Sequence, residues 1–100
     1  LWKTLQSMPE YKDKTTLIIT CDHGRGDANK NEWTSHGEKI ADAGQIWIAA
    51  IGPDTKHRGE VAGGDTLFQA QLATTFAALL GFDFKPDHPV MKPIDQITSK

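Results

Sequence analysis

Apolar residues in the first half of the chain follow two different patterns. Leu1, Leu5 and Met8 recur at i, i+4 and i+7, the spacing of one helix face, so a short opening helix is expected. Residues 15–21 (TTLIITC) form a β-branched run without polar alternation, which predicts a strand covered on both faces, as in parallel sheets. Residues 45–51 (QIWIAAI) predict a second buried strand of the same kind.

The second half contains the clearest helix pattern, over residues 66–80. Thr66 and Gln69 match a capping box at its start, and Gly81 stands where a C-terminal cap is expected. Five apolar residues recur at nearly 3.6-residue spacing and are expected to line its buried face: Phe68, Leu72, Phe76, Leu79 and Leu80. From residue 85 onward, three prolines predict an irregular tail that lies over the surface.

Residues 22–44, between the two expected strands, are rich in Gly, Asn, Asp and Lys and show no hydrophobic period. A loop of this length inside a compact domain is usually functional. The order helix, strand, long loop, strand, loop, helix predicts part of a three-layer α/β domain. A length of 100 residues allows one small domain at most, and a helix that begins at Leu1 suggests a segment of a larger domain.

Composition excludes some partners. A net charge of −2 without a Lys/Arg-rich run offers no basic field for nucleic acid or an anionic membrane, so neither is expected as a partner. No long apolar segment is present, so no transmembrane helix is expected. The single Cys21 cannot form an intramolecular disulfide. The chain reads as soluble, but its compartment, cytoplasmic or periplasmic and secreted, stays open.

The candidate chemistry begins where the first expected strand ends, at Asp22-His23-Gly24. Ligands of open α/β sheets bind outside the carboxyl ends of the strands, and Gly24 allows a sharp bend there. A carboxylate beside an imidazole is a common partial ligand set for zinc or manganese, and His36 lies in the same loop. We therefore predict Asp22, His23 and His36 as metal ligands. The alternative is a chance tripeptide and a solvated loop histidine.

The segment from Thr16 to Gly24 (TLIITCDHG) resembles the strand and Asp-His-Gly segment of the alkaline phosphatase superfamily. That superfamily includes phosphatases, nucleotide pyrophosphatases acting as phosphodiesterases, cofactor-independent phosphoglycerate mutases, phosphopentomutases and sulfatases. The strand before Gly52 and the helix ending at Gly81 are also similar to its last strand and closing helix. The resemblance implies an α/β three-layer sandwich with a mostly parallel sheet, with residues 1–100 as the C-terminal segment of one catalytic domain.

The resemblance also implies roles for the ligand candidates. Asp22 and His23 would bind the ion that holds the catalytic nucleophile, and His36 would bind a second divalent ion, with zinc or manganese most suitable. The two ions would clamp the phosphoryl group of a small-molecule phosphate ester. The nucleophile and the other ligands of the family lie upstream of the matching segment, so no catalytic residue is assigned. The upstream remainder of the domain is an expected partner, and residues 1–100 alone are expected to be inactive.

Two other functions stay open. A sulfatase would use a single calcium ion and a lysine in place of the second ion's histidine; His36 favours two ions, although Lys39 lies nearby. A non-catalytic α/β binding module would carry the Asp-His-Gly by chance. Arg25 is either a group that pairs with a substrate phosphate or sulfate, or a solvated loop side chain. The substrate, the metal and the oligomeric state are not specified by this sequence.

Overall fold

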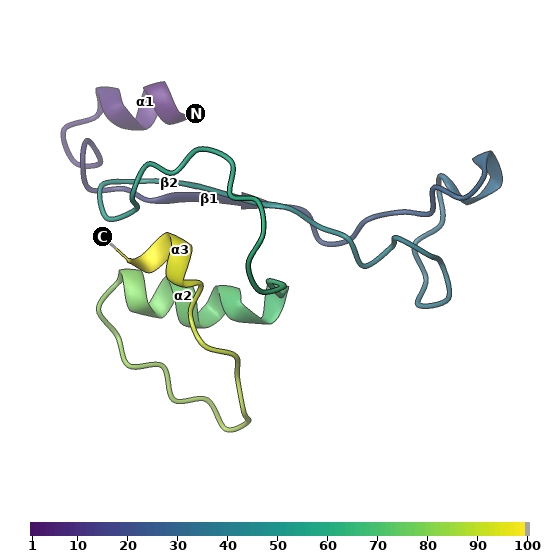
Figure 1. Ribbon diagram of the computed structural model, residues 1–100. Coiled ribbons are helices and arrows are strands. Elements are labelled where there is room, and N and C mark those ends of the chain that lie inside the picture. Colours follow the sequence, from purple (N-terminus) through teal and green to yellow (C-terminus); the bar gives the residue numbers. More distant parts are fainter. Residues whose placement is uncertain (100) are drawn as a thin grey trace. The chain divides into compact units, whose positions relative to one another are not determined.

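The computed structural model describes residues 1–99, and these fall into two compact units. One unit combines residues 1–17 with the chain from Ala50 onward, and the other consists of residues 18–49. In chain order (Figure 1), the elements are α1 (Trp2–Ser7), β1 (Leu17–Thr20), the 3-10 helix η1 (Lys30–Glu32), β2 (Ile48–Ile51), the 3-10 helix η2 (Gln69–Gln71), α2 (Leu72–Leu79) and α3 (Asp95–Thr98). No helix within residues 1–99 has the length and apolar character needed to cross a bilayer.

The two predicted strands are confirmed with shorter bounds, and they pair with each other in one two-stranded sheet. The pairing is antiparallel: the Thr20 hydroxyl donates to the Trp47 carbonyl at 2.7 Å, while Thr16 lies against Gly52 at the other end. Within residues 1–99 neither strand is covered on both faces, contrary to expectation, and Ile19 is 47% exposed. Mostly parallel sheets often hold one antiparallel strand, so the three-layer sandwich and the single domain stay predictions.

The predicted end of helix α2 is confirmed at Gly81. This glycine has a φ of +76°, its amide donates to the Ala78 carbonyl at 3.1 Å, and the Phe82 amide donates to the Ala77 carbonyl at 2.8 Å. These are the two hydrogen bonds of a Schellman motif, in which glycine adopts the left-handed conformation at least cost. The helix therefore ends for the reason that the sequence indicated.

The predicted start of that helical segment is wrong by two residues. The Gln71 side-chain carbonyl accepts from the Phe68 amide at 2.8 Å, so the helical segment begins with η2 after Phe68 rather than after Thr66. The Gln71 side-chain amide also donates to the Lys92 carbonyl at 3.1 Å. The Gln71 side chain thus fixes the helix start through its oxygen and binds the distant tail through its nitrogen.

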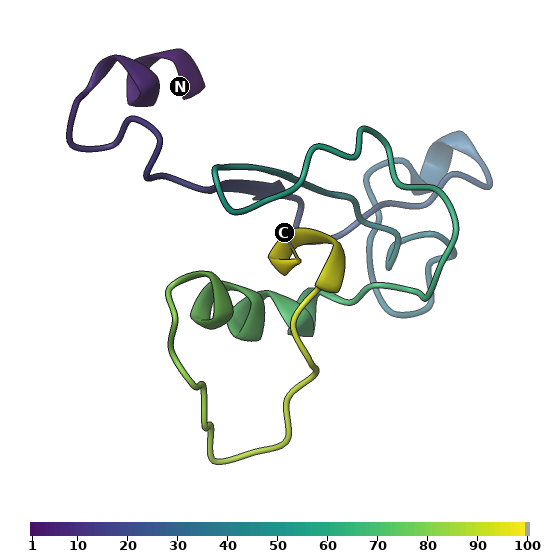
Figure 2. The same cartoon turned by 60° about the vertical axis from the view of Figure 1, so that its left-hand side comes forward.

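Helix α2 buries a polar face rather than its apolar one. The Thr75 side chain is fully buried; its hydroxyl donates to the Gln71 carbonyl at 2.6 Å and accepts from the Ile94 amide at 2.9 Å. Thr74 donates to the carbonyl of Met91 at 2.8 Å. These bonds fix the tail against α2, and Figure 2 shows α3 lying beside it. The tail covers the surface as expected, but it also contains the short helix α3, which was not predicted.

The apolar residues expected to face the core from α2 are largely exposed instead. Phe76 is 45% exposed and Leu80 is 72% exposed. The buried apolar side chains of this unit are Ile94, at 1% exposure, and Ile97, at 6%, both from the tail. Within the described residues, the expected buried face of α2 is therefore wrong.

Candidate metal centre

The long loop of residues 21–47 runs out and back as two adjacent segments, with η1 near its far end (Figure 1). Two backbone hydrogen bonds join the segments: the Gly24 amide donates to the Ala43 carbonyl at 2.7 Å, and the Gly26 amide donates to the Ser35 carbonyl at 2.9 Å. The second bond places Ser35, and with it His36, opposite the Asp-His-Gly segment. The backbone thus brings together the candidates that are 13 residues apart in sequence.

Both glycines are required because the two segments approach closely. A Cβ atom on Gly24 would lie 2.5 Å from the Asp42 carbonyl oxygen and 2.6 Å from that of Gln45. A Cβ atom on Gly26 would lie 2.5 Å from the Cβ of Glu32. Neither glycine has a positive φ, so Gly24 is needed for this contact and not for the sharp bend that the sequence suggested.

The imidazole rings of His23 and His36 stack on each other. Their centroids are 3.8 Å apart and their planes are inclined by 14°. The Asp22 carboxylate lies beside them, with Oδ1 3.6 Å from His23 Nε2 and 2.9 Å from the His23 amide nitrogen, which donates to it. The structure therefore places His23 against His36 and next to Asp22, and the assignment of these three residues as metal ligands stays a prediction.

The hydrogen bond of His23 Nδ1 determines which ring nitrogen can bind a metal. Nδ1 lies 2.7 Å from the Gly24 carbonyl oxygen, and because a carbonyl only accepts, Nδ1 must carry the proton. In that tautomer the lone pair is on Nε2, the nitrogen that faces Asp22. A backbone carbonyl on the other nitrogen is a common orienting partner of a metal-binding histidine. The donors present thus fit a metal ion that prefers nitrogen and oxygen ligands.

The stacked rings suit two ions better than one. A nitrogen lone pair lies in its ring plane, and planes inclined by 14° with centroids 3.8 Å apart meet only at a distance of about 10 Å or more. A zinc–imidazole bond is roughly 2.0–2.1 Å long. One ion therefore cannot lie in both planes, whereas two neighbouring ions can each take one imidazole.

The site is open, and its donors do not enclose an ion by themselves. The side chain of His23 is 41% exposed and that of Asp22 is 85% exposed. Within residues 1–99, no group of three His, Cys, Asp or Glu side chains converges on a point where a metal ion would be held. The three candidates therefore do not form a metal site by themselves within the described residues.

Glu32 lies in the same loop as the ligand candidates. It is half-buried beneath Gly26, and its Oε2 atom is buried without a hydrogen-bond partner in the described residues. A signal was present: Asn29 and Glu32 have the spacing of a capping box, and the Asn29 side chain caps η1 by accepting from the Asn31 amide. Asp27, by contrast, is exposed.

Comparison of the chain with protein-family models, curated proteins and solved structures found no match. The resemblance to the alkaline phosphatase superfamily stays a prediction from the sequence.

Proposed function

We propose that residues 18–49 supply part of a two-metal centre in an enzyme that acts on phosphoric esters, a hydrolase or phosphotransferase similar to the alkaline phosphatase superfamily. The observation that supports this proposal is the His23–His36 stack with Asp22 beside it. Two histidines that are 13 residues apart in sequence stack on each other, and their nearly parallel ring planes support separate ions rather than one shared ion.

Each ligand candidate has a separate role in the proposal. Asp22 and His23 Nε2 hold one ion, and His36 holds the second. The Gly24 carbonyl fixes the His23 ring through Nδ1, which keeps Nε2 available as a ligand. When bound, two divalent ions, zinc or manganese, neutralise charge on the transferring phosphoryl group and activate an oxygen nucleophile.

The donor count requires further ligands. Each ion takes about four ligands, and three side chains cannot serve two ions. We propose that the remaining ligands and the nucleophile come from polypeptide outside residues 1–100, so that these residues by themselves bind metal weakly and catalyse nothing.

The test is elemental analysis of the full-length polypeptide and its His36→Ala variant. Two transition-metal ions per chain are expected, falling toward one in the variant. His57→Ala and His88→Ala are matched controls, because both histidines are exposed and lie outside residues 18–49; neither change is expected to alter metal content.

Two results would contradict the proposal and select an alternative. A single calcium ion that persists in His36→Ala would indicate the sulfatase. Absence of bound metal from the wild-type protein would make the non-catalytic binding module the remaining alternative.

A further inference from the structure

The Arg25 side chain is exposed, and no hydrogen bond or ion pair joins its guanidinium to another group of residues 1–99. Two other cations differ in this respect. Lys30 Nζ lies 5.9 Å from the centre of the Trp33 ring, within reach of a cation–π contact, and Arg58 in the other unit donates to Ser99 Oγ at 3.2 Å. Arg25 thus keeps its full set of donors available for a ligand.

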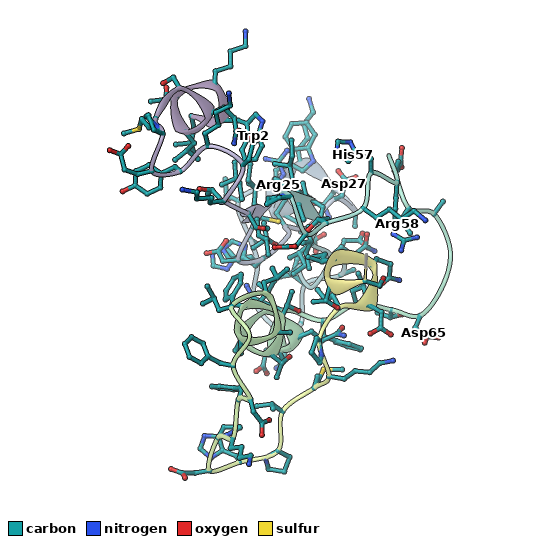
Figure 3. All side chains as sticks on the ribbon, turned by 90° about the vertical axis from the view of Figure 1, so that its left-hand side faces the viewer. Trp2, Arg25, Asp27, His57, Arg58 and Asp65 are labelled. Carbon is teal, nitrogen blue, oxygen red and sulfur yellow. The ribbon has the colours of Figure 1, made fainter. Side chains whose placement is uncertain are left out.

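The backbone on both sides of Arg25 is held in place. Gly24 and Gly26 each donate an amide hydrogen bond across the loop, and the Cβ direction of each is blocked by the opposite segment. Arg25 therefore lies between two backbone positions that the opposite segment fixes, and it is two residues from His23. Figure 3 labels Arg25 and, two residues further along the segment, Asp27.

From this placement we infer that Arg25 binds the non-bridging oxygens of the tetrahedral phosphoryl group at the His23–His36 centre. The inference rests on the proposed two-metal function, to which it adds a substrate-binding residue. A guanidinium is planar, stays charged, and offers paired N–H donors that match two oxygens of a phosphate. An ammonium at this position would supply charge without that paired geometry.

The test uses inorganic phosphate as the probe and full-length protein loaded with zinc. Phosphate affinity is measured by calorimetry for the wild type, Arg25→Ala, Arg25→Lys and Lys30→Ala, with zinc content measured on the same samples. Loss of a charge-assisted bidentate contact is expected to weaken phosphate binding at least about tenfold in Arg25→Ala. Arg25→Lys should show an intermediate loss, Lys30→Ala should stay within about twofold, and zinc content should not change.

Two outcomes would overturn the inference: wild-type phosphate affinity in Arg25→Ala, or a parallel loss of zinc and phosphate, which would assign Arg25 a structural role. A separate measurement on metal-free protein distinguishes failure of the two-metal function from failure of this inference. It follows the NMR signal of the Arg25 Nε–H group as phosphate is added. A phosphate-dependent shift of this signal, in a wild type that takes up no zinc, would retain Arg25 as an anion-binding residue and refute the metal centre alone.

Discussion

The close approach at Gly24 makes a quantitative prediction about the candidate centre. In Gly24→Ala the added methyl group would meet two backbone carbonyl oxygens, of Asp42 and Gln45, at 2.5 and 2.6 Å. Backbone atoms cannot rotate away as a flexible side chain can, so the two loop segments must separate. Separation also lengthens the 2.7 Å hydrogen bond from the Gly24 amide to Ala43.

The expected cost combines these two effects. Overpacking costs about 1–3 kcal/mol, and a lost hydrogen bond adds about 0.5–1.5 kcal/mol. We expect the free energy of local opening to fall by about 2–4 kcal/mol, which corresponds to roughly 30- to several-hundred-fold faster amide exchange at residue 24. His23 lies next to this contact, so zinc content should fall as well.

Gly44→Ala is the matched control within the same loop. Its added Cβ atom would meet nothing within 4 Å, and its φ is not positive. Exchange at residue 24 should then change by less than about threefold, because an alanine in an unstrained position is neutral or slightly stabilising. Equal protection in Gly24→Ala and Gly44→Ala would refute the close approach and, with it, the argument that the glycines position His23 and Arg25.

Two further predictions concern helix α2 and are checked by urea unfolding. Thr75→Val should lower the free energy of unfolding by about 1–3 kcal/mol, because the buried Ile94 amide loses its acceptor; an unchanged midpoint would contradict that hydrogen bond. Ile94→Ala should cost about 2–5 kcal/mol, whereas Leu80→Ala should cost less than about 1 kcal/mol because Leu80 is 72% exposed; equal losses would show that Leu80 is covered.

Local signals in the sequence predicted the parts of the fold that depend on local chemistry. The β-branched run gave β1, and Gly81 gave the end of α2, because a left-handed residue at a helix end favours glycine whatever surrounds it. The face that α2 buries depends instead on the tail. Thr75 is buried because the amide of Ile94, 19 residues away, donates to its hydroxyl. Periodicity cannot reveal a partner at that distance.

The candidate site shows the same division. Asp22, His23 and His36 are predicted as ligands from residue type and from their position after a strand, and the structure shows that His23 stacks on His36. Gly24 is required for a close approach rather than for the predicted bend, and no role was predicted for Gly26, because a close approach depends on which backbone lies opposite. The stacking of the His23 and His36 rings is likewise visible only in three dimensions.

Three features of the described residues have the same explanation if the predicted three-layer α/β sandwich is present. A two-stranded sheet is marginal in water, Leu80 exposes most of its side chain, and three donors are too few for two ions. A three-layer sandwich would cover both faces of β1, give the apolar face of α2 a surface to pack on, and bring further side chains to the strand end that carries Asp22. The predicted fold and the proposed metal centre can be tested separately. Exposure of the Leu80 side chain tests whether a further layer covers α2, and this test needs no metal. Loss of an ion in His36→Ala tests the metal centre and does not depend on the fold.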